Sequence, residues 1–397
     1  MEYVRIGEIC SKVCSGGTPT SSNPNYYNGG IPWLNTNEVN FCNIYATNKT
    51  ISQEGLEHSA AKYIPVNTVI VAMYGVTAGK SAIAKIPLTT NQACCNLVID
   101  DNKADYQYVY YFLKQQSDNL NKLANGGAQQ NLNSLIIKKY KIALHSLQIQ
   151  HRIASILSAY DSLIENNTKR IRLLEKMAEN LYKEWFVRFR FPGYEKAEME
   201  NGLPKGWKHG KLGDIVEFLN GFAFKSQTFC AEGKYSIVTI KNVRSDGFEG
   251  NNTDKVLELP SRIPKHCLLK EGDILLSLTG NIGRVCRVLG NGYLLNQRVA
   301  KLKSKNPLFC YCTFKSDYIY QSLNVISYGT AQLNLSPVKA SKIKLPIPLL
   351  ELLNNFEQIV KPIFAEIDTL LHQNSLLARR RDLLLPRLMS GKLEVKP

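Results

Sequence analysis

The segment MYGVTAGKSAIA, residues 73–84, looks at first like a phosphate-binding loop, because Gly-Lys-Ser follows an apolar run. Such a loop needs four residues between its glycines, and a helix must then begin so that its N-terminus faces the anion. Here three residues separate Gly75 from Gly79. The following residues, 81–100, have a β-like composition and contain Pro87. The spacing therefore argues against nucleotide binding.

The ten cysteines could in principle hold a metal ion, but none belongs to a Cys-x-x-Cys pair. No histidine lies at zinc-ligand spacing from the closest sets. These sets are Cys10/Cys14, Cys94/Cys95 and Cys310/Cys312. The six histidines form no pattern of their own. We predict no metal site and reduced thiols.

The motifs of two DNA-modifying chemistries are also missing. An N6-adenine methyltransferase holds its flipped base with an Asn/Asp-Pro-Pro-aromatic loop, and the chain contains no Pro-Pro pair. A nuclease needs clustered carboxylates for its metal, whereas the C-terminal LEVKP offers one Glu-x-Lys without an evident acidic partner. The sequence therefore predicts a protein without catalytic residues.

The overall charge favours a polyanionic partner. The 397 residues carry a net charge of +16 with a pI of about 9.3. Such a balance is typical of nucleic-acid binding, and the length suits two or three domains. No apolar run approaches the 18 residues of a membrane span, and the N-terminus lacks an apolar signal region. We predict a cytoplasmic protein.

An internal repeat organises the whole chain. Five segments recur at offsets between 203 and 207 residues, which indicates two copies of one unit. In the repeat, Gly79-Lys80 corresponds to Gly283-Arg284, so the second copy has no Gly-Lys-Ser. The cation suits a phosphate or a guanine edge, although a hairpin with a solvated cation is the equal alternative. The segments are 4–9 with 210–215, 78–84 with 282–288, 90–97 with 295–302, 126–133 with 329–336, and 160–167 with 367–374.

Each copy has the same predicted order of elements. About 140 residues of β-rich, mixed character come first, followed by an aromatic helix, 105–116 or 308–323. The aromatic residues have roughly helical spacing, which favours core packing over base stacking. A G-x-A-Q-x-N-L loop and a Lys-rich strand follow, and a long helix closes the copy.

The two long helices carry a heptad pattern, because their core-phase residues alternate gaps of three and four. Asn167 and Asn374 occupy the same phase, where a buried polar residue can fix register. We predict an intramolecular antiparallel pair; parallel dimerisation is the alternative. Pro362 and Pro386 should limit or kink the second helix. The predicted interface consists of Ile153, Ile156, Tyr160, Leu163, Asn167, Arg170, Leu174, Met177 and Leu181 with Val360, Ile363, Ile367, Leu370, Asn374, Leu377, Arg381, Leu384 and Leu388.

The predicted fold class is α+β, with two pseudo-repeated mixed α/β domains separated by two long antiparallel coiled-coil helices. A segment rich in Pro, Gly and charge marks the boundary between copies. The predicted ranges are the first domain at 1–145, the first long helix at 146–190, a linker at 191–210, the second domain at 211–347, and the second long helix with a tail at 348–397.

Together these features resemble type I restriction–modification specificity subunits, over nearly all of the chain. The resemblance rests on the duplicated order of recognition domain and helix, and on five motifs that are weak singly but specific in this order. They are LPKGWKHGKLGDI (203–215), LTGNIGRVCRV (278–288), GTAQLNLS (329–336), LYKEWFVRF (181–189) and LLLPRLMSGKLEV (383–395).

The resemblance implies a non-catalytic subunit whose two recognition domains each read one half of a split, asymmetric DNA site. It implies that the helices set the spacing and dock two methyltransferase subunits, and that a motor/nuclease subunit joins for restriction. S-adenosylmethionine, ATP and Mg²⁺ are then expected only in those partners, with no cofactor in this chain. The half-sites should lie about one DNA turn, roughly 34 Å, apart.

Candidate DNA contacts are polar residues, chosen because Arg suits guanine and Asn or Gln suits adenine. Residues shared by both copies are better candidates for fold or phosphate contacts than for base choice, because the two half-sites should differ. The unshared residues, such as those of SSNPNYYNGG (21–30), are the better candidates for base contacts. The full set is Tyr74, Lys80, Asn91, Gln92, Gln129, Asn131, Lys225, Arg244, Arg284, Asn296, Gln297, Arg298, Gln332 and Asn334.

Two other classes of function stay open at this stage. One is an enzyme, a degenerate nuclease or methyltransferase fused to a reader, which would turn over S-adenosylmethionine or cut DNA alone. The other is a coiled-coil scaffold whose basic surface is incidental. DNA binding that weakens steeply with salt would separate the reader from the scaffold.

Overall fold

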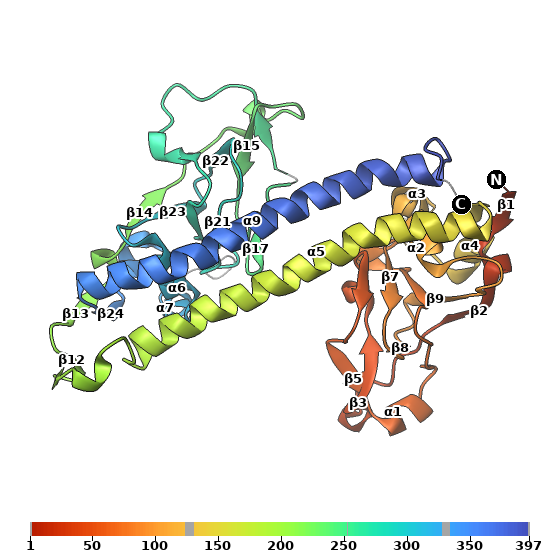
Figure 1. The fold of residues 1–397 in the computed structure, drawn as a ribbon, viewed down its shortest axis with the longest axis horizontal. Coiled ribbons are helices and arrows are strands. Elements are labelled where there is room, and N and C mark those ends of the chain that lie inside the picture. Colours follow the sequence, from red (N-terminus) through yellow and green to blue (C-terminus); the bar gives the residue numbers. More distant parts are fainter. Residues whose placement is uncertain (1, 124–130, 252, 328–333, 396–397) are drawn as a thin grey trace. The chain divides into compact units, whose positions relative to one another are not determined.

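The computed structural model describes residues 2–123, 131–251, 253–327 and 334–395. Its contacts divide the chain into two compact units (Figure 1). Unit 1 comprises Met1–Glu165 and Ser375–Pro397, and unit 2 comprises Asn166–Asn374. The cut passes through both long helices, so each unit contains a recognition domain and a segment of each helix.

Unit 1 is built around two sheets. The five-stranded sheet has the order β2 (Cys10–Ser15), β9 (Cys94–Ile99), β6 (Val69–Ala72), β7 (Ser81–Ala84), β4 (Cys42–Ile44). The three-stranded sheet has the order β5 (Lys49–Ile51), β3 (Tyr27–Leu34), β8 (Thr89–Thr90), and α1 (Gln53–Glu57) follows β5. A separate pair joins β1 (Glu2–Arg5) to β10 (Lys141–Leu144).

Unit 2 repeats this plan with two four-stranded sheets. The first has the order β14 (Glu217–Asn220), β23 (Val299–Lys303), β20 (Ile274–Ser277), β21 (Val285–Arg287). The second has the order β18 (Lys255–Val256), β15 (Tyr235–Val238), β22 (Tyr293–Leu295), β19 (Leu268–Leu269). Three pairs complete it: β13 (Lys208–Lys211) with β24 (Lys344–Ile347), β16 (Val243–Arg244) with β17 (Gly247–Phe248), and β11 (Met199–Glu200) with β12 (Leu203–Pro204).

The strand pairings match between the copies. β3 pairs parallel with β8, as β15 does with β22. β6 lies antiparallel between β7 and β9, as β20 lies between β21 and β23. The apolar runs VIVA of β6 and ILLS of β20 are completely buried, as expected for central strands. The duplication, and with it the predicted α+β class, is confirmed at the level of topology.

Short helices cover the sheets at matching places. They are α2 (Tyr106–Gln115), α3 (Ser117–Lys122) and α4 (Ser134–Lys139) in unit 1, and α6 (Pro307–Lys315), α7 (Asp317–Val325) and α8 (Pro337–Ala340) in unit 2. Tyr108 and Tyr311 of the aromatic helices are both buried. The Tyr108 hydroxyl donates to the Ala143 carbonyl over 2.7 Å. Core packing of these aromatic residues, as predicted, is therefore confirmed.

The long helices are α5 (Leu147–Tyr182), which ends in a π-turn at Lys183–Val187, and α9 (Leu350–Met389). Their contacts run in opposite chain directions. Asp161 meets Arg381 within unit 1, and Arg170 meets Glu366 within unit 2. The helices therefore pack antiparallel within one chain, as predicted (Figure 1).

The predicted interface is wrong at alternate positions of α5. Leu163 is 51% exposed and Met177 is 56% exposed, whereas the neighbours Ile164 and Ala178 are covered. Leu157 and Ile171 are more buried than the predicted Ile156 and Arg170. Ile156 nevertheless packs against the core of unit 1, and Arg170 pairs with Glu366 of α9. One residue turns a helix by about 100°, and α5 must cover the recognition core as well as α9, so its apolar stripe is not a simple seam. Ile153, Tyr160, Asn167 and Leu174, and the α9 residues Ile363, Ile367, Leu370, Asn374 and Leu377, are buried or half-buried.

The prolines of α9 do not end it. The helix continues through Pro362 and Pro386 over all 40 residues. Each proline lacks the N–H that would bond to the carbonyl four residues earlier, which normally weakens an isolated helix. Burial of Val360, Phe364 and Leu388 beside them stabilises the helical path in tertiary packing.

Asn167 and Asn374 lie where the helices exchange matching hydrogen bonds. Asn167 Nδ2 donates to Gln373 Oε1 over 3.3 Å, and Asn374 Nδ2 donates to Thr168 Oγ1 over 3.4 Å. Both bonds link residues 206 positions apart, so each helix gives and receives one bond across a local pseudo-two-fold relation. Within the described residues, Asn374 Oδ1 is buried and accepts no hydrogen bond from a donor. The pair is therefore specific for register and costly in stability.

We predict that Asn374→Leu raises the free energy of unfolding by about 1 kcal/mol, because it removes the unsatisfied oxygen. The register should become less defined, and light scattering should reveal dimers formed by exchanged helices. Asn167→Leu is the matched variant. A monomeric mass together with a lowered melting temperature in both variants would contradict a role in register.

A repeated carboxylate fastens each recognition domain to its closing helix. Asp161 accepts a 2.6 Å hydrogen bond from the Tyr111 hydroxyl of α2 and an ion pair from Arg381 of α9. Its counterpart Asp368 receives both guanidinium nitrogens of Arg287 from β21, at 3.0 and 2.8 Å. The side chains of these pairs are mostly buried, so loss of one partner leaves a poorly solvated charge.

Asp161→Ala should therefore lower the free energy of unfolding by about 2 kcal/mol, because it leaves the Tyr111 hydroxyl unpaired and removes one of the two carboxylates that pair with the mostly buried Arg381, which keeps Asp382. Glu366→Ala is the control. Its ion pair with Arg170 is about half exposed, and its loss should cost less than about 1 kcal/mol. Urea unfolding measures both. Equal effects of the two substitutions would show that the carboxylate is not an anchor.

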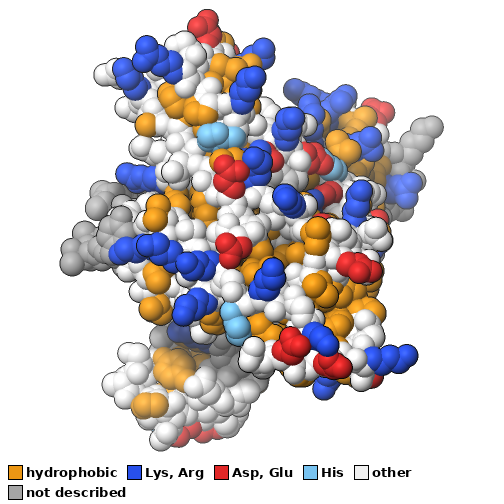
Figure 2. Space-filling view, turned by 90° about the vertical axis from the view of Figure 1, so that its left-hand side faces the viewer, with side chains coloured by type: hydrophobic (Ala, Val, Ile, Leu, Met, Phe, Trp, Pro, Cys, Tyr) orange, Lys and Arg blue, Asp and Glu red, His pale blue; other side chains and the backbone are white. Residues whose placement is uncertain are grey.

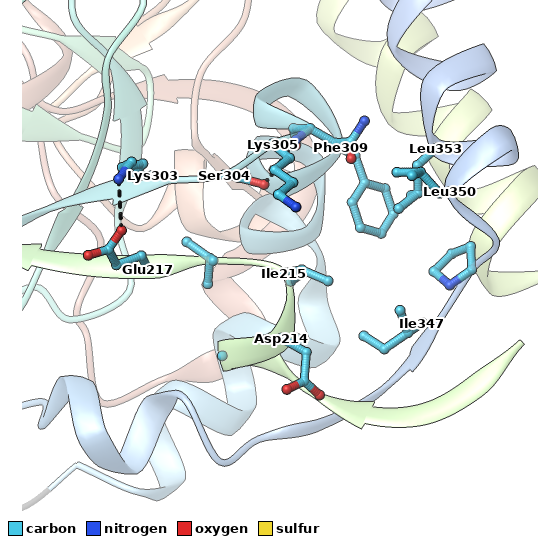
Figure 3. A pocket seen from close by; sticks show the side chains of 14 residues that line it. Asp214, Ile215, Glu217, Lys303, Ser304, Lys305, Phe309, Ile347, Leu350 and Leu353 are labelled. Carbon is cyan, nitrogen blue, oxygen red and sulfur yellow. Dashed lines mark hydrogen bonds and ion pairs between the residues drawn. The ribbon is translucent and has the colours of Figure 1, made fainter.

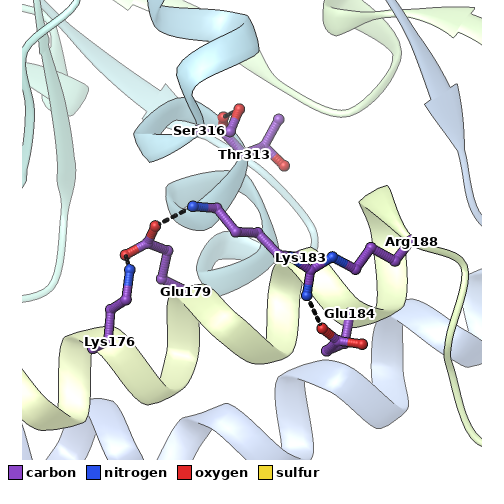
Figure 4. A network of polar contacts seen from close by, with 7 residues as sticks. All are labelled: Lys176, Glu179, Lys183, Glu184, Arg188, Thr313 and Ser316. Carbon is purple, nitrogen blue, oxygen red and sulfur yellow. Dashed lines mark hydrogen bonds and ion pairs between the residues drawn. The ribbon is translucent and has the colours of Figure 1, made fainter.

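The segment after α5 packs on unit 2 before the second copy begins. Trp185 and Phe186 contact Phe356 and Trp207 edge-on or tilted. Ion pairs between Lys176, Glu179 and Lys183 line this end of α5 (Figure 4), and the bond from Lys183 holds the pKa of Glu179 below its usual range. Strand pairing begins inside the range 191–210 predicted as linker: Met199 of β11 pairs with Pro204 of β12, and Lys208 then pairs with Ile347.

Candidate nucleic-acid interface

Three segments meet at the end of the central strand in each unit, and we call this arrangement the strand-end junction. In unit 1 the Met73 N–H donates to the Ala93 carbonyl, and the Met73 carbonyl accepts from the Leu132 N–H, both over 2.8 Å. In unit 2 the Leu278 N–H donates to Arg298 over 3.0 Å and its carbonyl accepts from Leu335 over 2.8 Å. The two copies therefore share one backbone frame.

The junction brings together most of the predicted DNA contacts of unit 1. Tyr74 follows Met73, pairs with Asn131 and is exposed, as are Gln92 and Asn131. Asn91 is half-buried, and its Nδ2 donates to Asn35 Oδ1 over 3.4 Å. Gln92 Oε1 accepts a hydrogen bond from the Thr18 hydroxyl.

Unit 2 presents the corresponding set with different side chains. Thr279 takes the place of Tyr74 and pairs with Asn334. Asn296 is half-buried and its Oδ1 accepts from the Arg298 N–H over 3.4 Å, while the side chains of Gln297 and Arg298 are exposed. The same frame therefore offers an alanine at position 93 and an exposed arginine at position 298.

Lys80 and Arg284 lie on the hairpin that leads away from each junction. Their carbonyls accept from the N–H groups of Ala72 and Ser277, each over 2.9 Å. The glycines before them have φ of +80° and +78°, a left-handed conformation that glycine adopts without strain. In unit 1 a short 3-10 turn at Gly75–Thr77 precedes Gly79, and strand β7 begins at Ser81, directly after Lys80. Because no helix begins after Gly79-Lys80, the phosphate-binding-loop reading is excluded for this segment.

Four predicted contacts are not part of this arrangement as described. Lys225 is exposed and precedes a 3-10 turn at Ser226–Thr228, and Arg244 pairs with Glu249 over 3.4 Å on the β16–β17 hairpin. Neither hydrogen-bonds to the junction of unit 2 in the part of the chain that the structure describes. Gln129 and Gln332 lie outside the described residues.

Sequence reasoning missed several residues of this surface. Thr18 and Asn35 hold the predicted Gln92 and Asn91, and the Thr77 hydroxyl bonds to the Thr36 carbonyl over 2.8 Å. Phe41 and Lys114 stand beside Lys80, with both lysine nitrogens near the Phe41 ring. Only the polar composition of residues 35–40 signalled this loop, and nothing in the sequence pointed to Phe41.

The described His, Cys, Asp and Glu side chains show neither a metal-binding cluster nor an activated thiol. Within the described residues, no group of three His, Cys, Asp or Glu side chains could hold a metal ion. Burial raises the pKa of the Cys10 and Cys95 thiols to about 12, which disfavours the reactive thiolate. Lys and Arg side chains are dispersed among acidic ones on the face shown in Figure 2. No helix in the described parts combines the length and apolar character required to cross a membrane.

One cavity of about 520 Å³ lies in unit 2 between the recognition sheet and the start of α9 (Figure 3). Phe309, Leu350 and Leu353 form an apolar side, and the Lys303–Glu217 ion pair lies at its edge over 3.0 Å. Its lining also includes the polar side chains of Asp214, Lys305 and Asn306, so the cavity is only partly apolar. Its lining residues do not include the predicted DNA contacts.

Comparison with known proteins identifies the family. The family model described as type I restriction modification DNA specificity domain matches residues 1–176 and 204–376, one match for each copy. The chain belongs to this family. It is a specificity subunit of a restriction–modification system, and catalysis lies in partner subunits of such systems.

Individual relatives match either nearly all of the chain or about half of it. The type I restriction enzyme MjaIX specificity subunit of Methanocaldococcus jannaschii is 29% identical over 98% of this chain and 92% of its own length. The EcoR124I/EcoR124II specificity subunit of Escherichia coli is 28% identical over 48% of this chain and 49% of its own. The crystal structure of a type I S subunit from M. genitalium covers 98% of this chain and 95% of its own, with 19% identity and a TM-score of 0.57, which supports the fold.

The two hairpin glycines provide a matched pair of substitutions. Alanine at either position incurs the left-handed backbone cost of about 1–2 kcal/mol. At Gly79 the new Cβ would also lie 2.8 Å from the Ser117 carbonyl oxygen, whereas at Gly283 it meets the movable Tyr320 ring at 3.2 Å. We predict that Gly79→Ala lowers the free energy of unfolding more than Gly283→Ala. Equal losses in urea unfolding would contradict this.

Proposed function

We propose that each unit reads one half of a split, asymmetric DNA site, with the strand-end junction facing the DNA. The observation that carries the proposal is the repeated frame around Met73 and Leu278, which presents different exposed side chains in the two copies. A shared frame suits one docking mode on DNA, and different side chains suit different base sequences. The charge of +16 supports DNA as the partner.

The shared and unshared residues would have separate roles. Asn91 with Gln92, and Asn296 with Gln297, recur in both copies and suit contacts to the sugar-phosphate backbone. The unshared residues, among them Tyr74, Thr279 and Arg298, are the candidates for base contacts. Gln129, Asn131, Gln332 and Asn334 belong to the repeated loop and join the backbone class in this proposal.

The long helices would set the distance between half-sites. At a rise of 1.5 Å per residue, the 36 residues of α5 extend about 54 Å, and one DNA turn is about 34 Å. A helix pair of this length can therefore span half-sites one turn apart. The register bonds of Asn167 and Asn374 would keep that distance fixed.

The helices would also dock two methyltransferase subunits, and a motor/nuclease subunit would join for restriction. Exposed apolar side chains support docking: Leu173 and Met177 on α5 within unit 2, and Leu376 and Leu383 on α9 within unit 1. Large apolar groups exposed on a helix commonly mark a protein interface. S-adenosylmethionine, ATP and Mg²⁺ would be bound by those partners and not by this chain.

Mapping N6-methyladenine across a genome tests the proposal. The chain is co-expressed with the methyltransferase subunit of its own system, and a split motif with a fixed gap is expected. Replacing residues 1–145 with those of a relative should change one half of the motif and leave the other half and the gap unchanged. The reciprocal replacement of 211–347 is the matched control.

Two results would overturn this function. An unsplit motif, or methylation that depends on neither domain, would remove the two-reader arrangement. A methyltransferase complex that binds DNA with the same affinity at 50 and 200 mM salt would leave a scaffold as the role, because phosphate contacts make binding strongly salt-dependent. Turnover by the chain alone would instead indicate a catalytic protein.

A further inference from the structure

We infer that a pocket beside the junction of unit 1, lined in part by Phe41, Lys114 and Arg381, binds one phosphate of the DNA backbone. The inference rests on the proposed function. It adds a pocket whose lining residues are not among the predicted DNA contacts, although the predicted Lys80 lies beside its Phe41. The pocket has a volume of about 610 Å³ and is completed by Asn40, Gln115, Asp382, Leu385 and Pro386. All of its lining residues belong to unit 1.

Two lysine nitrogens converge on one ring. Lys80 Nζ lies 6.0 Å from the centre of the Phe41 ring, and Lys114 Nζ lies 5.8 Å from it. Lys80 Nζ also donates to Asn40 Oδ1 over 2.8 Å. An aromatic face can hold ammonium groups near one another without neutralising them. Contact with the ring therefore leaves both ammonium charges available to bind an anion.

The backbone at Phe41 is held in an unusual conformation. Its φ of +53° lies in the left-handed region, which is strained for a bulky residue. The Phe41 N–H donates to the Ser81 carbonyl over 2.8 Å and fixes this turn next to β7. Strain of this kind persists where the surroundings enforce it, often at binding sites. Here it places the ring within about 6 Å of both lysine nitrogens.

The carboxylates near the pocket are already engaged. Asp161 and Asp382 both pair with Arg381, so the local charge is three cations against two anions when Lys80 and Lys114 are included. Within the described residues, Lys114 has no ion pair, and burial lowers its pKa. Asp161 and Asp382 act on the pKa of Lys114 in the opposite direction, but neither carboxylate lies within ion-pair distance of its nitrogen in the described part of the chain, so this partly desolvated ammonium gains from an incoming anion.

Unit 2 supplies a contrast at the end of its matching helix. Lys315 Nζ of α6 donates to the Ser245 carbonyl over 3.0 Å, and its neighbour Arg244 pairs with Glu249. The chain itself satisfies the lysine there. The arrangement around Lys114 is therefore specific to unit 1 and is not repeated around Lys315 in unit 2.

The position of the pocket favours a DNA phosphate over other anions. Three separate hydrogen bonds tie the loop beside the pocket to the hairpin and the junction: Lys80 to Asn40, Thr77 to Thr36, and Asn91 to Asn35. The loop 35–41 therefore forms one edge of the surface that carries Tyr74 and Gln92. A duplex laid on that surface would bring its backbone to the edge, where a lysine contacts phosphate without reading sequence.

The test measures DNA affinity against salt for the complete complex of this chain with its methyltransferase, using a duplex that carries the mapped site. Lys114→Gln should reduce the slope of log K against log salt by about 0.9, the value for one lost phosphate contact on B-DNA. The methylated motif should be unchanged. Lys114→Arg should keep the slope, and Lys315→Gln is the matched control that should not alter it.

The folded state is checked by the melting temperature, which Lys114→Gln should not lower, because it removes a desolvated charge. Phe41→Leu provides a second variant, and its slope should fall in the same direction. A wild-type slope in Lys114→Gln, with intact DNA binding by the wild-type complex, overturns the inference alone. Weaker assembly with the methyltransferase at an unchanged slope also overturns it, in favour of an acidic protein side chain. Loss of site-specific methylation in the wild-type complex would instead count against the proposed function.

Discussion

The structure depends on one constraint, which is that each long helix must bury its apolar side against two partners at once. α5 contributes Ile153 and Leu157 to the core of unit 1, and Ile171 and Ala178 to the core of unit 2. α9 adds Leu385 and Leu388 to the first core and Phe356 and Val360 to the second. A seam for one partner would need a narrower stripe. The packing of both recognition domains therefore follows from the antiparallel course of the helices.

The two copies share the backbone hydrogen bonds that hold the surface loops but differ in the side chains that these loops expose. The bonds around Met73 and Leu278 are the same in both copies, so the surface loops are held in the same way regardless of the residues they present. The anchoring carboxylates Asp161 and Asp368 are also repeated, but their partners differ. Evolution of a new specificity then requires changes at exposed positions such as Arg298, where the frame tolerates either a small or a long side chain.

The sequence was sufficient for the architecture because its strongest signals were non-local and periodic. The internal repeat predicted two similar domains, the alternating gaps predicted a coiled coil, and the presence of both helices in one chain favoured an antiparallel pair. The details failed where two adjacent apolar residues competed for one position, as with Leu163 and Ile164, because periodicity does not tell which of them faces the core. The prolines of α9 were misjudged since local preference was outweighed by tertiary burial.

The site was only partly visible in the sequence for a different reason. Repeated polar residues could be found by comparing the copies, and the junction gathers most of them. Residues that exist in one copy, such as Phe41 and Lys114, leave no repeat signal, and their approach to Lys80 depends on a strained turn that no motif encodes. Such positions emerge only from the folded arrangement.

The Asp161 anchor has a consequence for synthesis of the chain. Its cationic partner Arg381 lies near the C-terminus, and Leu385, Leu388 and Met389 also complete the core of unit 1. Unit 2, by contrast, is continuous from Asn166 to Asn374, and Asp368 finds Arg287 inside it. Vectorial folding usually finishes the N-terminal domain first. Here the domain that emerges first from the ribosome is completed last, and until then its exposed core must be kept from aggregating.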